Sequence, residues 1–181
     1  MKLRSLLDWP IRIQVIVGPL LFFIIALLIA GAATFAMYQV RQTYADMEES
    51  YEFLAEVSEY SKLVVDMETG VRGYVLAQSP AFLEPYNNAV AALTAILARL
   101  RSHAIADPVQ LQQLDLLEAQ LSSWQQKVAL PRIQAVSEGQ PLDLTLGTLQ
   151  KGKSLFDEVR TTIDAIKASE GSVLALRTQQ S

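Results

Sequence analysis

The chain has 181 residues, no cysteine, one histidine and a formal net charge of −4, and 51% of its residues are hydrophobic. This length indicates one domain with an attached element. The acidic balance excludes a nucleic-acid binder, because no basic stripe is present that could neutralise phosphates. Without cysteine there can be no disulfide or thiolate metal site, and the single histidine, His103, excludes multi-histidine metal sites. We expect no metal and no cofactor.

The first forty residues differ in kind from the rest. Residues 13–40 contain no charged side chain, and this run is longer than the roughly 20 apolar residues that cross a bilayer core. Three basic residues precede the run, and four acidic residues follow it closely. The positive-inside rule then predicts a cytoplasmic segment at 1–12, a transmembrane helix at 13–40 and an extracytoplasmic domain at 41–181. A cleaved signal peptide is the alternative, although its apolar region is usually only about 7–15 residues long.

The first helix beyond the membrane segment continues from it without a breaker. It is predicted to end at "QSPAF", where Ser79 can cap a new helix and Pro80 suits the first helical position. Residues recur along it with alternating spacings of four and three, which is typical of a seam in an antiparallel bundle or coiled coil. We expect this seam to comprise Val40, Tyr44, Met47, Tyr51, Leu54, Ser58, Ser61, Val65, Glu68 and Arg72. A competing stripe consists of Val57, Val64 and Val71.

Three further helices are predicted. The second runs from Pro80 to about His103, the third begins at Pro108, and the fourth covers about 142–179. The expected core-facing residues of the second helix are Phe82, Tyr86, Ala89, Leu93, Ile96 and Leu100. Those of the third helix are Leu114, Leu117, Leu121, Trp124 and Val128. Those of the fourth helix are Leu146, Leu149, Phe156, Ile163, Ile166 and Leu174. The predicted fold class is all-α: an N-terminal transmembrane helix that continues into an antiparallel up-down-up-down four-helix bundle.

Local residues mark where these helices begin, bend and end. Asp107 is the expected N-cap of the third helix. Pro131 predicts a kink or local unwinding within that helix, because proline has no backbone N–H and its ring crowds the preceding turn. Gly139 is a candidate C-terminal cap.

No catalytic site is predicted, so we expect a chain that is not an enzyme. There is no glycine-rich phosphate loop, and no Ser or Asp lies at a meaningful spacing from His103, which we expect to cap carbonyls or face solvent. Trp124 and the tyrosines could form an aromatic ligand pocket, but core packing is the commoner use of aromatics at helical spacing. The acidic residues between 46 and 59 could bind a cation, but a solvated face is the simpler interpretation.

The stretch "DMETGVRGYVLA" interrupts the apolar pattern near the end of the first helix. Glu68 and Arg72 are four residues apart and share one helix face, with the acid in the better, N-terminal position. Buried on a bundle seam, such a pair specifies register more than it stabilises. Gly70 and Gly73 would let a neighbouring helix or turn approach closely. We predict a special packing point here, with contact to a ligand as the alternative.

The longer segment "ETGVRGYVLAQSPAFLEPYNNA" resembles the signature of the CHASE family of extracytoplasmic sensory domains, third class. Two later segments, "DPVQLQQLDLLEAQLSSWQQKV" and "ASEGSVLALR", are similar to the third and fourth helices of that family. The resemblance extends over roughly residues 38–177. The residues that carry the signature are Glu68, Thr69, Gly70, Arg72, Gly73, Tyr74, Phe82, Glu84, Pro85 and Tyr86.

The resemblance implies a sensory input domain of a membrane-bound receptor, most often a two-component histidine kinase and otherwise a chemoreceptor or diguanylate cyclase. It implies the bacterial inner (plasma) membrane, with the bundle periplasmic or extracellular, and a second membrane helix after the bundle. We expect a homodimer and an unidentified extracytoplasmic ligand or partner protein. The candidate polar switch layer is Glu68 with Arg72, acting as the first and fourth helices shift. The alternative is a stand-alone anchored bundle with a structural or protein-interaction role.

Overall fold

A computed structural model of the chain describes residues 11–179, with the side chains of residues 16–42 and 44–179. Every element in this described part is helical. The elements are α1 (Ile11–Ala77), the 3-10 turn η2 (Pro80–Leu83), α2 (Glu84–His103), the 3-10 turn η3 (Ala104–Ala106), α3 (Pro108–Trp124), the π-helical turn η4 (Gln125–Ala129), α4 (Leu130–Ser137) and α5 (Leu146–Gln179). The chain divides into two compact units, one ending at Asp46 and the other beginning at Met47.

The N-terminal unit contains the apolar part of α1. This helix is long and apolar enough to cross a membrane, and none of its most apolar window is buried within the structure. Side chains such as Phe22 and Leu28 are 75% and 68% exposed. Apolar surface of this extent is favoured in a hydrocarbon environment rather than in water. The segment from Pro80 to Ala106 passes the same test of length and composition, but a third of its window is buried, because it lies in the bundle.

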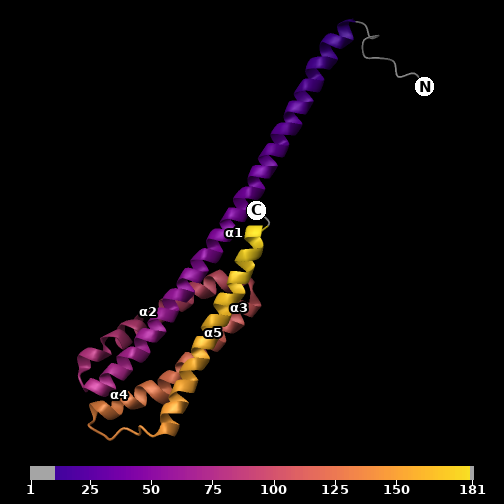
Figure 1. Ribbon diagram of the computed structural model, residues 1–181. Helices are drawn as coiled ribbons and strands as arrows, with labels where there is room; N and C mark the ends of the chain where they lie inside the picture. The colour runs from indigo at the N-terminus through magenta and orange to yellow at the C-terminus, as the bar shows by residue number, and fades with distance from the viewer. Residues whose placement is uncertain (1–10, 180–181) are drawn as a thin grey trace. The chain divides into compact units, whose positions relative to one another are not determined.

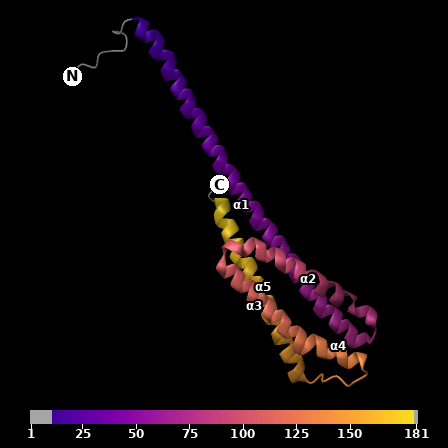
Figure 2. The same ribbon diagram turned by 180° about the vertical axis from the view of Figure 1, so that it is seen from behind.

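The second unit is an antiparallel bundle of four helical segments. They are residues 47–77 of α1, then α2, then the run α3–η4–α4, and finally α5, which lie side by side in both views (Figures 1 and 2). The α1–α2 turn and the α4–α5 connection lie at one end, called here the Gly70 end. The α2–α3 turn lies at the other, called the His103 end. The predicted four-helix bundle is therefore confirmed.

The side of α1 that faces the core differs from our main prediction. The competing stripe is the real seam, with these residues buried: Phe53, Val57, Tyr60, Val64, Met67, Val71 and Tyr74. On the predicted seam, Tyr51 and Val65 are 57% and 38% exposed. Both stripes have the same spacing, so periodicity could not separate them. The chosen seam has no charged member, whereas the predicted one would have buried Glu68 and Arg72, at a cost of several kcal/mol per ion.

The core-facing residues predicted for α2 and α3 are buried, with Phe82 as the exception at 50% exposed. In α5, Phe156, Ile163 and Ile166 are buried as predicted, whereas Leu146 and Leu149 are 72% and 42% exposed. The helix α5 also begins later than predicted, at Leu146 and not at residue 142, so Leu146 is its first residue. Asp143 stabilises the preceding loop instead, since its carboxylate accepts hydrogen bonds from the backbone N–H of Thr145 and the hydroxyl of Thr148.

Two of the three predicted helix caps are confirmed. The Asp107 carboxylate accepts hydrogen bonds from the backbone N–H groups of Val109 and Gln110, at 2.9 and 3.1 Å. Gly139 has a φ of +66°, and the bonds around it have the Schellman pattern: Gln140 N–H donates to the Ala135 carbonyl and Gly139 N–H to that of Val136. The cap predicted at Ser79 is wrong, because its side chain makes no capping hydrogen bond and a 3-10 turn follows it.

The third helical segment loosens just before Pro131, as predicted. The π-helical turn Gln125–Ala129 joins α3 to α4, and Pro131 occupies the first turn of α4. A proline inside a regular α-helix removes one hydrogen bond and crowds the carbonyl four residues earlier, and the wider turn accommodates both effects. The turn also bears Val128 and leads to Arg132, two side chains that line the cavity described below.

Candidate functional site

Gly70 and Gly73 form the contact between α1 and the α1–α2 turn. A Cβ atom on Gly70 would lie 2.9 Å from the backbone nitrogen of Tyr86, and one on Gly73 would lie 2.9 Å from Cδ1 of Phe82. The chain reverses at Gln78, which has a φ of +52°, and then lies directly on this glycine face. The close approach that we predicted for the two glycines is therefore confirmed, and the neighbour is the turn itself together with the start of α2.

The signature residues divide between this turn and its surroundings. Tyr74 and Tyr86 are buried in the bundle. Burial raises the pKa of the Tyr86 phenol, and a hydrogen bond with Gln125 of the π-helical turn acts in the opposite direction. Thr69, Glu84 and Pro85 are exposed, and Phe82 covers Gly73 at the surface. Most of the signature therefore builds the turn.

A cavity of about 550 Å³ lies at the Gly70 end of the bundle. It is lined by α1, by Trp124 at the end of α3, by the π-helical turn with α4, by the α4–α5 connection and by the first half of α5. Trp124 and Phe156 form part of its wall, and their rings pack at a centroid distance of 5.2 Å. Aromatic and aliphatic walls with a few polar groups are typical of small-molecule sites.

Glu68 is the acidic centre of this cavity. Its carboxylate lies 3.8 Å from a guanidinium nitrogen of Arg72 and 3.7 Å from one of Arg160. The side chain of Glu68 is 26% exposed, but that of Arg72 is 70% exposed. The expected burial of Glu68 with Arg72 on the seam is therefore wrong. The two residues lie beside the seam, because Val71 occupies the core position between them.

Arg132 and Arg160 are the functional candidates that the sequence did not single out. Burial lowers the pKa of the Arg132 guanidinium, and the negative charge of Glu68 acts in the opposite direction. Arg160 lies over the ring of Phe156, with 4.9 Å from Cζ to the ring centroid. Gly152 leaves room for Arg132, because a Cβ there would lie 3.2 Å from Nη2 of that arginine. Glu68 and Arg160 lie on different helices, so no local pattern could have paired them.

The aromatic pocket considered from sequence does not exist in that form. Tyr44 and Tyr51 are exposed, whereas Tyr60, Tyr74 and Tyr86 are buried in the core. Trp124 is 3% exposed, which agrees with the core role that we favoured for it.

The His103 end carries a second group of polar contacts. His103 neither caps carbonyls nor faces solvent freely: its ring is edge-on to Phe53, and its nitrogens lie 4.0 and 3.8 Å from the carboxylates of Glu49 and Glu56. Glu56, expected on a solvated face, is 16% exposed and accepts a 2.5 Å hydrogen bond from Arg99. The ring of His103 is thus held between two acidic side chains on α1.

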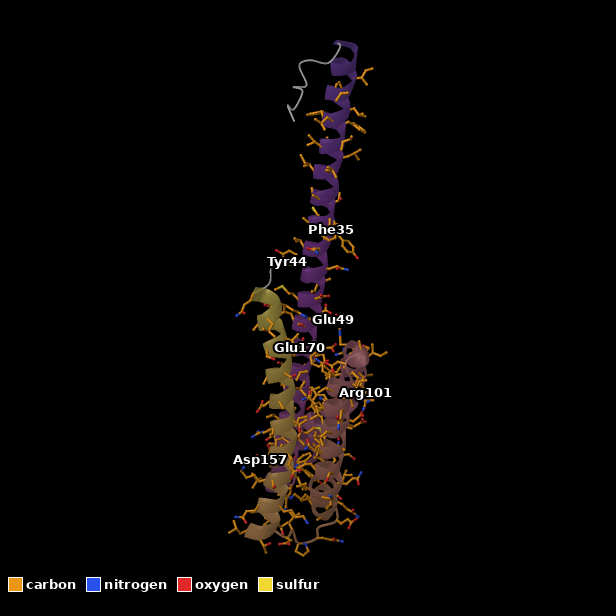
Figure 3. The ribbon with its side chains drawn as sticks, turned by 90° about the vertical axis from the view of Figure 1, so that its right-hand side faces the viewer. Phe35, Tyr44, Glu49, Arg101, Asp157 and Glu170 are labelled. Atoms are coloured by element: carbon orange, nitrogen blue, oxygen red, sulfur yellow. The ribbon has the colours of Figure 1, made fainter. Side chains whose placement is uncertain are left out.

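Two further contacts attach α5 to the rest of the bundle near the same end. The buried carboxylate of Glu170 accepts a hydrogen bond of 2.7 Å from Gln110. Arg177 donates one of 2.6 Å to the hydroxyl of Ser50, which is 1% exposed. Glu170 lies toward this end of α5 and Asp157 toward the cavity end (Figure 3).

The fold and the site define a helical-bundle domain with a cavity of small-molecule size at one end. A family model described as the CHASE3 domain matches residues 43–180, which is more than half of the chain. The chain therefore belongs to the CHASE3 family, whose members are extracytoplasmic, non-catalytic sensory domains of signalling receptors. This confirms the resemblance seen in the sequence. Searches of curated proteins and of solved structures gave no match.

Proposed function

We propose that this chain is the input part of a membrane-bound receptor whose output is a two-component histidine kinase. The observation that carries the proposal is the composition of α1: one helix contains both the exposed apolar segment and the buried stripe of the sensory bundle. A displacement of that stripe is therefore a displacement of a helix that also contains the membrane segment. The excess of basic residues before the apolar segment supports a cytoplasmic N-terminus in a bacterial inner membrane and a periplasmic bundle.

The proposed mechanism is a shift of α1 relative to α5. Helix shifts of about 1–2 Å are common in signalling proteins and need no unfolding. The hydrogen bond between Ser50 and Arg177 joins these helices at the His103 end, and Glu68 lies near Arg160 at the Gly70 end. The switch layer proposed from sequence, Glu68 with Arg72, thus gains a member on α5.

A homodimer is part of the proposal, and an exposed face of α1 supports it. Tyr51, Ser58 and Val65 recur at intervals of seven on this face, and all three are exposed. Leu54 and Ser61 lie between them and are partly exposed. Heptad spacing on an uncovered helix face is the pattern that a second helix packs against in a coiled coil. The second copy of α1 is the partner that we propose for it.

The intact mass of the native protein in its membrane, followed by an autophosphorylation assay, tests the kinase output. A mass well above the 20.0 kDa of this chain, with phosphate transferred to a histidine, is expected. A native mass of 20.0 kDa would overturn the kinase proposal and favour the stand-alone bundle.

The switch layer is tested in the complete receptor by combining Glu68→Gln with Arg72→Met. Loss of the charges should change the ratio of stimulated to basal output, because the contact to Arg160 is lost as well. If both outputs stay at the wild-type level in a folded protein, this layer is not the switch.

Introduced cysteines test the dimer cleanly, because the sequence has none of its own. Tyr51→Cys should form a disulfide-linked dimer in membranes. Leu116→Cys is the control: it is 50% exposed on α3, away from the proposed face. Equal cross-linking at both positions, or none at Tyr51→Cys, would contradict the proposed interface.

A further inference from the structure

The cavity at the Gly70 end combines an apolar wall with an excess of positive charge. Its exposed apolar surface comes from Leu76, Leu144 and Leu149, which are 84%, 50% and 42% exposed, whereas Val71, Trp124 and Phe156, which also line it, are buried. A volume of about 550 Å³ is within the range of small-molecule sites, roughly 300–1,000 Å³. Four cationic side chains and two carboxylates also line it: Arg72, Arg132, Lys153, Arg160, Glu68 and Asp157. The formal charge of these six groups is therefore +2.

The charges are unequally matched. Lys153 pairs with Asp157, four residues along the same helix. That leaves one carboxylate, Glu68, among three guanidinium groups. A charge-assisted hydrogen bond between these groups has a length of about 2.7–2.9 Å. Glu68 lies 3.8 Å from Arg72 and 3.7 Å from Arg160, so it attracts both without a hydrogen bond to either.

The guanidinium donors consequently remain available. Among the described residues, no hydrogen bond to an acceptor is formed by Arg72, Arg132 or Arg160. Arg132 is the most informative of the three, because it is partly buried and, among the described residues, has no ion pair within 4.0 Å; the negative charge of Glu68 favours its charged form. A partly buried cation without a bound anion is unfavourable, and a carboxylate in the fork of a guanidinium removes that cost.

We infer that this cavity binds a small organic carboxylate that carries an aromatic or branched apolar group. The guanidinium groups of Arg132 and Arg160 would hold the carboxylate. The exposed leucines of the wall, Leu76, Leu144 and Leu149, would contact the apolar part. An inorganic anion would leave that wall uncovered, and the net positive charge disfavours a cation. A ligand here contacts α1, α4 and α5 together, so it gives the sensory role a chemical class of stimulus and rests on the proposed function for that meaning.

Trp124 offers a direct readout of occupancy. The chain has two tryptophans, Trp9 and Trp124. In a Trp9→Phe background, Trp124 is the sole tryptophan and lies on the cavity wall. The full chain in detergent micelles would be titrated with benzoate, phenylacetate and isovalerate, and with the three corresponding uncharged amides. We expect at least one carboxylate to quench the fluorescence of Trp124, or to shift its emission spectrum, in a saturable way. The corresponding amide should cause no such change.

Matched variants locate the binding. Arg132→Gln should weaken the binding of the responding carboxylate by about tenfold or more, as expected when one partner of a buried charge contact is lost. Lys127→Gln removes a positive charge from the neighbouring π-helical turn but does not line this cavity, so the affinity should stay within about twofold. Arg160→Gln provides a second test if Arg132→Gln does not fold.

Three results would overturn the inference. They are the absence of a saturable response to all three carboxylates, an equal response to the amides, and equal losses in Arg132→Gln and Lys127→Gln. The titration measures the binding of a ligand to the cavity of this chain and does not depend on the output of a receptor. Its failure would remove the ligand class and leave the kinase proposal intact, whereas a native mass of 20.0 kDa would remove the kinase output and leave the binding intact.

Discussion

The close contact at Gly70 allows a specific prediction about the stability of the bundle. In Gly70→Ala, the new Cβ would lie 2.9 Å from the backbone nitrogen of Tyr86, 3.2 Å from its Cβ and 3.3 Å from the carbonyl oxygen of Phe82. Two of these three neighbours are backbone atoms, which no rotamer change can move. The whole start of α2 must therefore shift away from α1, although Tyr86 is 7% exposed and fixed in the core.

Two opposing terms set the size of the effect. Overpacking a well-packed site costs typically about 1–3 kcal/mol, and a rigid backbone neighbour places this site in the upper part of that range. Replacing glycine by alanine inside a helix returns roughly 1 kcal/mol through helix propensity. We expect a net destabilisation of about 1–2 kcal/mol. A change of 1 kcal/mol lowers the melting temperature by roughly 2–4 °C in chains of this size.

Gly171→Ala is the matched control. Gly171 also lies inside a long helix, but nothing lies within 4 Å of the position where its Cβ would be built. The same substitution should therefore stabilise the bundle by about 0.5–1 kcal/mol. Thermal unfolding followed by circular dichroism in detergent micelles measures both variants against the wild type. A melting temperature that rises in Gly70→Ala as it does in Gly171→Ala would refute the close contact.

Three further predictions concern other contacts of the bundle. Gly152→Ala should reduce carboxylate binding several-fold, because the new Cβ would lie 3.2 Å from the flexible end of the Arg132 side chain, and it should lower the melting temperature, because the Cβ would lie 3.3 Å from Cγ1 of the buried Val128; the Trp124 titration measures the first effect and thermal unfolding the second. Asp107→Ala should lower the free energy of unfolding by about 1 kcal/mol in urea titrations, since two backbone N–H groups lose their cap. Hydrogen bonds lower the pKa of Asp143, and the largest effect comes from the backbone N–H of Thr145. The ionised carboxylate therefore stabilises the fold above the ordinary pKa of 3.8, and this stabilisation is lost as the pH falls through the lowered pKa. The melting temperature of Asp143→Asn should consequently depend less on pH in this acid range than that of the wild type.

Local chemistry predicted the elements of this fold well. Each of Asp107, Pro131 and Gly139 acts on its own backbone or on the turn beside it, so its role can be read from a few neighbouring residues. The glycines at 70 and 73 were predicted to admit a neighbour for the same reason. The late start of α5 was missed, because hydrogen bonds from Thr145 and Thr148 to Asp143 stabilise the loop where apolar spacing alone indicates helix.

The side of α1 that faces the core could not be decided from periodicity. Two stripes with the same heptad spacing run along the same helix, so the spacing of their residues does not select between them. The cost of burying charge did distinguish them in principle, since one stripe ends in Glu68 and Arg72. The candidate site could not be predicted for a related reason: Arg132, Arg160 and Glu68 come from three different helices, and they line one cavity only after the chain has folded.

The three faces of α1 give a physical reason for the unusual stretch around Gly70. Val64, Met67 and Val71 face the core, Gly70 and Gly73 carry the turn, and Glu68 with Arg72 lines the cavity. Side chains three or four residues apart share a helix face, so one short segment can serve all three surfaces. The proposed ligand of Arg132 and Arg160 would reach this segment through Glu68, which lies 3.7 Å from Arg160. On the proposed mechanism, a movement of α5 at the cavity would then reach α1 through Glu68, on a segment whose glycine face already packs against the start of α2.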